Sequence, residues 1–187
     1  MTKKELKKVL KEDKEIYFGK MNFKNIIRRY TYFRFMRYGK FVMLARKTGW
    51  YELNMNKSFL YKVLSFYYKR KKNKLGEKLN IEFDLKEFGR RLKIYHGNIV
   101  VNGSSVIGDD CELHGNNCIG NKGPRFDLDA CPILGNSVVV GYGSNIIGKI
   151  SIANNTIISA NTLVNKNIIE EGYIYGGIPA KLIKGIE

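Results

Sequence analysis

The sequence lacks several features that define common protein classes. None of its apolar runs approaches the roughly 18 residues that a membrane-spanning helix needs. Its first residues are charged and contain no apolar core of a secretory signal. It has only three cysteines and no C-x-x-C pair, which favours structural thiols in a reducing cytoplasm over a disulfide framework. These absences predict a soluble, cytoplasmic protein.

Acidic residues are scarce in the first part of the chain. Residues 1–80 have 23 Lys and Arg against six Asp and Glu, whereas residues 81–187 have ten against eleven. The formal net charge of +16 therefore belongs to the N-terminal part, which also holds 16 of the 23 aromatic residues. Such an asymmetry indicates two regions with different roles.

Three interpretations of this basic, aromatic part are open. In the first, the aromatic residues pack between helices and against the end of a neighbouring domain, while the lysines are solvated. In the second, basic residues and interfacial aromatics contact an anionic membrane surface. Nucleic-acid binding is the third and the least favoured, because no recognisable nucleic-acid motif is present.

Hydrophobic periodicity predicts three helices in residues 1–80. Thr2 and Glu5 form a capping box for the first helix. The second is expected over about residues 23–47 with an interruption at Gly39, followed by a connection over residues 48–56. The third should begin near Ser58 and end in the basic run of residues 69–74. Its inward face is expected to hold four residues: Leu60, Val63, Leu64 and Tyr67.

An aliphatic residue recurs at steps of six in the second part of the chain. The ten matches are Val101, Ile107, Leu113, Ile119, Leu134, Val140, Ile146, Ile152, Ile158 and Val164. Four positions after most of them stands a small or β-branched residue: Ser105, Cys111, Val138, Ser144, Ile150, Thr156 and Thr162. A period of six fits neither a helix nor a simple strand, and it is typical of short strands coiled into a parallel β-helix. Asn and Gly supply the turns with positive φ that such a coil needs.

The repeat suggests a division of the chain into three parts. We expect a helical region over residues 1–80, a β-helix over residues 81–172 and a C-terminal tail over residues 173–187. One insert, over residues 121–132, breaks the period and must leave the coil as a loop.

The chain has only two histidines, His96 and His114. They are separated by three hexads, which make one turn of a triangular coil, so we expect them to stack on one face about 4.8 Å apart. The loop is expected to start on the coil above His114. A rigid scaffold with one irregular loop near two histidines predicts the position of a functional site.

Three segments resemble the hexapeptide-repeat acyltransferases, and within them the serine acetyltransferase-like branch. They are residues 94–108 (IYHGNIVVNGSSVIG), 129–136 (DACPILGN) and 175–181 (YGGIPAK). The resemblance covers about residues 82–184. It implies a mainly β fold, a left-handed parallel β-helix that assembles as a homotrimer. It also implies active sites between subunits, and acetyl-coenzyme A (acetyl-CoA) as the acetyl donor.

The resemblance also implies catalytic residues. The family's histidine matches His96, which would act as the general base, and imidazole has a suitable pKa near 6.5. Its acidic partner in the family lies about fifteen residues earlier. Ile81 stands at that offset, Glu82 fits if the preceding turn is one residue shorter, and Asp84 is the reserve candidate. A carboxylate there would fix the tautomer of the histidine.

Other positions are matched to substrate contacts. The resemblance places Gly120, Tyr142 and Ala160 along the coenzyme, where Tyr142 departs from the usual alanine. Lys181 is matched to the coenzyme phosphates. For His114 two interpretations remain open, a structural role and contact with the coenzyme or the acceptor.

Two departures from the serine acetyltransferases concern the acceptor. Tyr95 stands where those enzymes have an aspartate, and Cys131 stands where they have a histidine. Both family residues help to bind serine, and the long helical N-terminal domain of those enzymes is absent as well. The layout is closest to the O-acetyltransferases of capsule, O-antigen and exopolysaccharide pathways. The expected acceptor is therefore a bacterial surface polysaccharide or its sugar precursor, reached at the inner face of the cytoplasmic membrane.

Two other functions are kept as alternatives. One is serine O-acetylation by the same chemistry. The other is a non-catalytic β-helix scaffold that binds membrane or nucleic acid through its basic N-terminal region. The γ-type carbonic anhydrases have the same shape but need three histidine ligands, so no metal is expected here.

Overall fold

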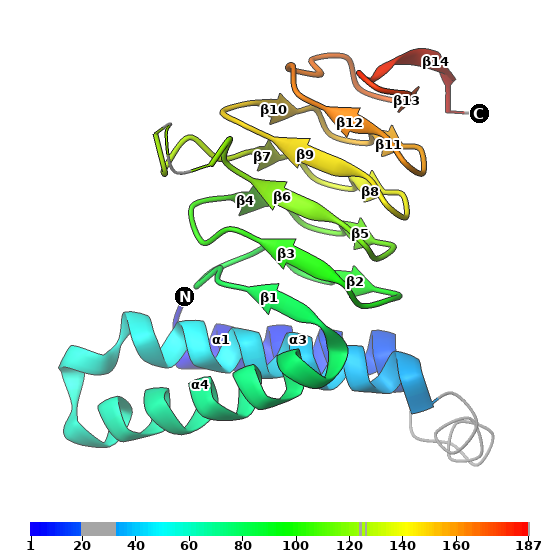
Figure 1. The fold of residues 1–187 in the computed structure, drawn as a ribbon. Coiled ribbons are helices and arrows are strands. Elements are labelled where there is room, and N and C mark those ends of the chain that lie inside the picture. The colour runs from blue at the N-terminus through cyan, green and yellow to red at the C-terminus, as the bar shows by residue number, and fades with distance from the viewer. Residues whose placement is uncertain (20–32, 124, 126, 187) are drawn as a thin grey trace.

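The computed structural model describes residues 1–19, 33–123, 125 and 127–186. Among these residues, three α-helices and a short 3₁₀ helix form a layer at one end of the molecule, and a coil of short strands rises from it (Figure 1). The helical elements are α1 (Lys3–Phe18), α3 (Phe33–Leu53), η1 (Met55–Lys57) and α4 (Phe59–Leu79). The chain passes from helix to strand beside the predicted boundary at residue 80, while the division into domains stays a prediction.

The strands stack in three sheets, one on each side of the coil. Their bounds are β1 (Ile81–Phe83), β2 (Lys93–Ile94), β3 (Ile99–Val101), β4 (Val106–Ile107), β5 (Glu112–Leu113), β6 (Cys118–Gly120), β7 (Ile133–Leu134), β8 (Val139–Val140), β9 (Asn145–Ile147), β10 (Ser151–Ile152), β11 (Ile157–Ile158), β12 (Leu163–Val164), β13 (Tyr173–Gly176) and β14 (Lys181–Gly185). The sheet orders are β1-β3-β6-β9-β12, β4-β7-β10 and β2-β5-β8-β11-β13-β14. The named strands pair in parallel, except for the antiparallel pair β13–β14 at the far end. The parallel β-helix predicted from the repeat is confirmed.

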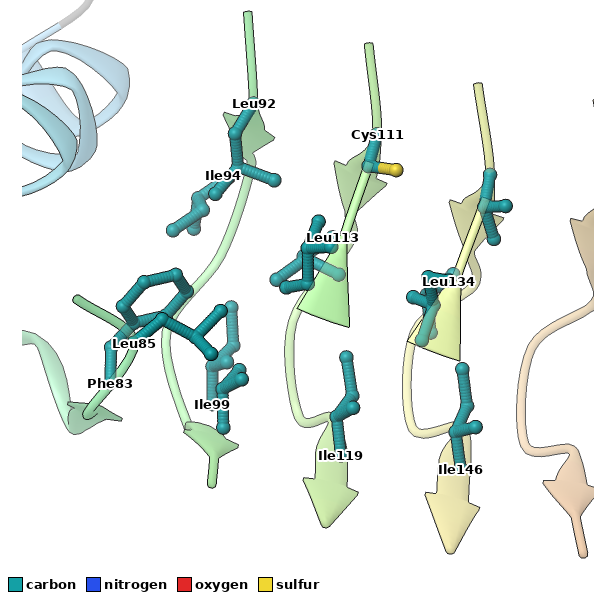
Figure 2. Packing of buried hydrophobic residues seen from close by; sticks show 14 of the residues in the cluster. Phe83, Leu85, Leu92, Ile94, Ile99, Cys111, Leu113, Ile119, Leu134 and Ile146 are labelled. Carbon is teal, nitrogen blue, oxygen red and sulfur yellow. The ribbon is translucent and has the colours of Figure 1, made fainter. Parts of the chain in front are cut away.

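The repeat residues form the core of this coil. All ten aliphatic repeat residues are buried, and so are the seven residues that stand four positions after a repeat position. Figure 2 shows the side chains of successive coils stacked in columns along the axis. Each large apolar side chain removed from water stabilises the fold by about 1.5–3 kcal/mol. At the helical end, Phe83 closes the core by edge contact with Phe41 and Phe88.

The corners of the coil use asparagine as predicted. Asn98, Asn116, Asn155 and Asn161 all have φ between 51° and 58°. Asparagine tolerates this left-handed conformation better than most residues, because its short side chain hydrogen-bonds locally.

The second predicted helix differs from α3 in two ways: α3 ends later, and glycine does not interrupt it. The helix runs through Gly39 and Gly49 to Leu53, so an interruption at Gly39 and a connection beginning at residue 48 were wrong. These glycines serve close packing. A Cβ at Gly39 would lie 2.4 Å from the Tyr17 ring, and one at Gly49 would lie 1.8 Å from the Lys86 carbonyl oxygen. The predicted start near residue 23 lies outside the described residues.

The third predicted helix is present, but its orientation was wrong. The helix begins next to Ser58 as expected, and the Ser58 side chain caps it. Leu60, Val63 and Tyr67, predicted to face inward, are exposed, while the buried face is formed by Ser65, Lys72, Gly76 and Leu79. Small residues let α4 approach α3 and β1 closely. This close packing, and not the apolar pattern, determines which face of α4 is buried. The helix also continues past the basic run and ends at Leu79, with Asn80 as a left-handed C-cap.

Buried polar contacts attach the helices to the first coil. The capping box of α1 is confirmed, with Thr2 and Glu5 bonding reciprocally. Arg46 on α3 pairs with the buried Asp13 carboxylate on α1 (Nε–Oδ2 2.5 Å) and donates to the carbonyl oxygens of Phe88 and Gly89. The Tyr17 hydroxyl accepts from the Ile94 N–H at 2.7 Å. These bonds fix the start of the coil on the helical layer.

Candidate functional site

His96 lies at the corner between β2 and β3, where it is exposed. The predicted stack of His96 on His114 was wrong by one position. Ile94 pairs with Leu113, so Tyr95 is the residue that lies beneath His114, with ring centroids 4.9 Å apart. The inward residues of the first full coil are Ile94 and Val101, which leaves one extra residue at this corner.

Gly115 gives the His96 ring its space. In the register of β2 and β5 it stands directly over His96, and a Cβ there would lie 2.5 Å from the His96 Cβ. Its φ of +109° also suits glycine. With this position free of a side chain, the His96 ring faces Tyr142, which lies two coils further on, at a centroid distance of 6.1 Å and an angle of 81°.

A cavity of about 400 Å³ opens beside His96. It is bounded by the C-terminal end of α4, by α3 and by the corner itself. The polar side chains that line it include Arg37, Tyr38, Lys78, Asn98 and Tyr142. No carboxylate is among the described lining residues, so the cavity is positively charged and suits an anionic or strongly polar ligand.

Among the described residues, no hydrogen bond or ion pair joins Glu82 or Asp84 to His96. Glu82 lies on β1 beside Val100, beyond the turn that carries His96. Asp84 pairs with Lys72 at 3.7 Å. Both carboxylates line a different and larger cavity, of about 770 Å³, on the sheet that contains β1. The catalytic role of Glu82 stays a prediction.

Glu112 is the carboxylate that the sequence interpretation missed. Its oxygens accept from Lys93 Nζ at 2.7 Å and from the Tyr95 hydroxyl at 3.2 Å, and one lies 3.6 Å from His114 Nε2. Burial opposes ionisation of Glu112, but these hydrogen bonds and the charge of Lys93 outweigh it and hold the pKa of Glu112 below its usual value. The signal was present in the sequence: residues 112 and 114 are two apart at the end of β5, so their side chains share a face.

An aromatic row connects this cluster to the helices. The His114 ring contacts Tyr95, Tyr95 contacts Phe35 of α3 at 5.6 Å, and Phe35 contacts Tyr17 of α1 at 4.7 Å. Since Tyr17 is also hydrogen-bonded to the first coil, the helical layer holds Tyr95 and His114 in place.

The loop over residues 121–132 leaves the coil at a different corner from the histidines. It joins β6 to β7, whereas His114 precedes β6. Figure 1 shows the loop at one edge of the coil and the turns after β2 and β5 at the opposite edge. Ser104 ties the loop down by donating to Asp129 at 2.8 Å. The prediction that the loop lies near both histidines of the same chain was therefore wrong, because the full width of one sheet separates the loop from the histidines.

The predicted acceptor contacts are divided in the same way. Tyr95 and His114 are in contact, but Cys131 is buried at the base of the loop, with its thiol directed to the Leu128 carbonyl oxygen. Burial raises the pKa of the Cys131 thiol. The three cysteines are free, and burial raises the pKa of Cys111 to about 11, as expected for a structural thiol.

The predicted coenzyme contacts also fall at two corners. Tyr142 and Ala160 lie in register above Gly115, so they continue the column that begins at His96. Gly120 ends β6, next to the loop. Lys181 is exposed at the start of β14. One chain therefore places His96, Tyr142 and Ala160 together, and Gly120 with the loop.

Among the described residues, no group of three or more His, Cys, Asp or Glu side chains is placed to hold a metal ion. No helix in the described part of the chain is long and apolar enough to cross a membrane.

Comparison with known proteins adds relatives by sequence. No family model matches the chain. It is 36% identical over 89 residues to WcaB of Escherichia coli, a protein named as an acetyltransferase of colanic acid biosynthesis, covering 47% of this chain and 54% of WcaB. It is 37% identical over 79 residues to a serine acetyltransferase of Helicobacter pylori, covering 42% of this chain and 46% of that protein. The chain thus spans about half the length of the curated relatives that it matches.

Solved structures provide the second comparison. Serine acetyltransferase of Neisseria gonorrhoeae superposes with a TM-score of 0.73 at 18% identity, covering 98% of this chain and 68% of that one. The Brucella abortus enzyme in complex with coenzyme A gives 0.73 at 20% identity, covering 99% and 70%. The left-handed parallel β-helix is confirmed by these neighbours. With the relatives found by sequence, they confirm that the chain resembles the hexapeptide-repeat acyltransferases, in the branch of the serine acetyltransferases.

Proposed function

We propose that the protein is an O-acetyltransferase that moves an acetyl group from acetyl-CoA to a hydroxyl group of a bacterial surface polysaccharide or its sugar precursor. The observation that carries the proposal is His96, held in a polar cavity on a β-helix whose relatives are named as acetyltransferases. Since the chain spans about half of those relatives, the activity is inferred from the site together with the resemblance.

In the proposed reaction, His96 is the general base. An acceptor hydroxyl is a poor nucleophile near neutral pH, and the imidazole takes its proton as the oxygen attacks the thioester carbonyl carbon. A carbon–oxygen bond forms and the carbon–sulfur bond breaks. The imidazolium then gives the proton to the thiolate, so the products are the acetyl ester and free coenzyme A. Backbone N–H groups of the coil supply hydrogen bonds to the oxyanion of the tetrahedral intermediate.

The corner column supports acetyl-CoA as the donor. Ala160 is small and exposed, so an extended pantetheine arm can approach the backbone there. Tyr142 differs from the family's alanine, and its ring faces His96. We propose that Tyr142 forms one wall of the cavity where the thioester meets the acceptor. Lys181, exposed near the end of the chain, is the proposed contact for the coenzyme phosphates.

Tyr95 and His114 support a sugar as the acceptor. The Tyr95 hydroxyl is bonded to Glu112, so this position presents an aromatic face where the serine acetyltransferases present an aspartate. A free amino acid needs a carboxylate for its ammonium group. The described lining of the His96 cavity offers none, and Glu112, beside Tyr95 and His114, is already paired with Lys93. An aromatic ring beside hydrogen-bonding groups is better suited to a sugar ring.

Glu112 gives His114 a positioning role in this proposal. The carboxylate stays ionised at neutral pH and lies 3.6 Å from His114 Nε2. At this distance the two groups form no hydrogen bond, and Nε2 is buried without another partner among the described residues, so the nearby negative charge favours the tautomer with a proton on Nε2. We propose that His114, oriented in this way, hydrogen-bonds the acceptor next to the base.

The active site is proposed to be completed by a second subunit of a homotrimer. Within one chain, the His96 corner lies the width of a sheet away from the loop and Gly120. Packing three flat-sided coils around a three-fold axis would bring the loop of one subunit to the histidine corner of the next.

The test is a screen of acceptors with the purified protein. Release of coenzyme A from acetyl-CoA is measured with serine, with nucleotide sugars and with lipid-linked sugars. Faster release with a sugar and none above background with serine is expected. Faster release with serine would instead assign the serine acetyltransferase activity. Calorimetry that detects no binding of coenzyme A would favour a non-catalytic scaffold.

A further inference from the structure

The outward face of α4 exposes large apolar side chains. Phe59 is 82% exposed and Phe66 is 60% exposed. The spacing of residues 59, 63, 66 and 67 puts them on one stripe of the helix. With Leu60, this stripe forms an apolar patch of five exposed residues: Phe59, Leu60, Val63, Phe66 and Tyr67. None of them is needed for the core, so the patch calls for a partner.

Basic side chains surround the apolar patch and extend it along the helix. Arg70 and Lys74 continue the stripe of Phe59, Val63 and Phe66 toward the C-terminal end of α4. The exposed basic residues of η1 and α4 are Lys57, Lys62, Lys69, Arg70, Lys71, Lys74 and Lys78. Glu77 is the single exposed acidic residue of α4. Glu77, five helical turns after Phe59, also lies on this stripe, so the face is apolar at one end and has a net positive charge at the other.

A rigid aromatic layer supports the patch from behind. Trp50 and Tyr51 of α3 contact Tyr61 of α4 at 5.4 and 5.5 Å, and Tyr51 stacks on Tyr68 at 5.3 Å. Because these contacts hold the end of α3 against α4, the helix that carries the patch is held in place without a partner.

We infer that this face of α4 docks the protein on the surface of an anionic lipid bilayer. Amphipathic helices with aromatic side chains on one face and Lys or Arg around them lie in the membrane interface, with the apolar groups below the headgroups. Basic residues near such a surface each add attraction to anionic lipids. The helix is too polar to span the bilayer, so it lies along it.

Charge and apolarity together select lipid over other partners. A second copy of the chain would bring together two N-terminal parts that each carry 23 Lys and Arg against six Asp and Glu. Nucleic acid would pair with the basic residues but would leave Phe59 and Phe66 without an apolar environment. An anionic bilayer offers an apolar environment to the phenylalanines and negative headgroups to the basic residues.

The docking orientation would place the candidate site near the membrane. α4 forms the outer side of the helical layer, and the coil rises away from it (Figure 1). The His96 cavity is bounded by Lys78, Leu79 and Asn80 at the end of α4. If the proposed function holds, an acceptor sugar carried by a membrane lipid would meet the enzyme at this level.

The test is co-sedimentation of the purified protein with vesicles. Wild-type protein should bind vesicles of equal parts phosphatidylglycerol and phosphatidylcholine, and binding should weaken in high salt. Binding to phosphatidylcholine alone should be much weaker. The Phe59→Ser/Phe66→Ser variant should lose at least about tenfold in partitioning, because two buried phenylalanines are removed. Arg70→Glu/Lys74→Glu should lose about as much by reversing two charges.

Matched controls come from the far end of the molecule. Ile169 is 82% exposed, like Phe59, so Ile169→Ser controls for the loss of an exposed apolar side chain. Lys149→Glu/Lys166→Glu controls for the change in net charge, since both residues are exposed on the coil. Both controls should bind vesicles as the wild type does. Thermal unfolding checks that each variant is folded, and the charge-reversal pair tests the face even if the serine pair is unstable.

Three outcomes would overturn the inference. Wild-type protein that ignores anionic vesicles would do so, and so would equal binding by the α4 variants and their controls. A change in oligomeric mass on Phe59→Ser, without vesicle binding by the wild type, would assign the face to a second copy. The measurement uses no acetyl donor, so its failure is distinguishable from failure of the proposed function.

Discussion

At the scale of single residues, the position of the His96 ring depends on a glycine in the next coil. Gly115 stands in register above His96 and leaves the space through which the imidazole reaches toward Tyr142. The position of the proposed base therefore depends on a residue that makes no polar contact with it among the described residues.

Gly115→Ala should abolish most of the activity and also reduce stability. The new methyl group would displace His96, and a displacement of about 1 Å at a reacting group costs about a hundredfold in rate. Alanine at φ +109° adds about 1–3 kcal/mol of strain. Gly172→Ala, at φ +79° with open space around it, carries a similar strain without the contact. Equal rates for the two variants in a coenzyme A release assay would contradict this account of Gly115.

Glu112→Gln should lower stability in a pH-dependent way. The folded pKa of Glu112 lies below its unfolded value of about 4.3, so its contribution is present above that value and is lost as pH falls through the folded pKa. Because the side chain is only partly buried, the expected loss at neutral pH is about 1 kcal/mol. Chemical unfolding from neutral to acidic pH measures it. A difference between wild type and variant that grows toward acid would contradict the assignment.

At the scale of elements, the sequence predicted the coil far better than the helices. The burial of the ten repeat residues could be predicted, because a coil that buries one residue in six gives the sequence an aliphatic residue at every sixth position. The buried face of α4 could not be predicted from hydrophobicity. The small residues Ser65 and Gly76 are buried, while the large apolar residues Phe59 and Val63 are exposed. A single extra residue at the His96 corner shifted the predicted stacking, since register errors of one move every neighbour.

The Arg46–Asp13 pair connects three parts of the fold: α3, α1 and the first coil. Arg46→Met should cost about 3–5 kcal/mol in unfolding free energy, because it leaves the Asp13 carboxylate buried and uncompensated. Asp13→Leu/Arg46→Met should cost less than the single change. Glu15→Gln, which breaks the exposed Lys11–Glu15 pair, should cost well under about 1 kcal/mol in the same denaturation experiment. A small loss for Arg46→Met would show that the helical layer is attached in another way.

At the scale of the whole molecule, the candidate site is divided between two corners. His96, Tyr142 and Ala160 share one corner, and Gly120 and Cys131 lie at the other. Through the resemblance, the sequence proposes site residues at both corners. It does not predict that these residues lie apart in one chain, because the resemblance gives their order along the coil and not their distances.

Mixed assemblies test the proposed division between subunits. A His96→Gln variant and a variant with a shortened 121–132 loop should each be inactive alone. Co-expressed with two different tags and purified through both, they should regain part of the wild-type rate, because some clefts would combine an intact corner with an intact loop. Light scattering should give three times the 21.5 kDa chain mass. A monomer, or no recovery in mixed assemblies, would contradict the composite site.

The most direct test of the account is the rate of acetyl transfer by His96→Gln. The substitution removes the proposed base at a position exposed to solvent, so folding should be unaffected. With acetyl-CoA and the best acceptor from the screen, the rate should fall by about a hundredfold to ten-thousandfold. His114→Gln should cause a smaller loss, expressed mainly in the KM for the acceptor. A His96→Gln rate within twofold of the wild type would contradict His96 as the base.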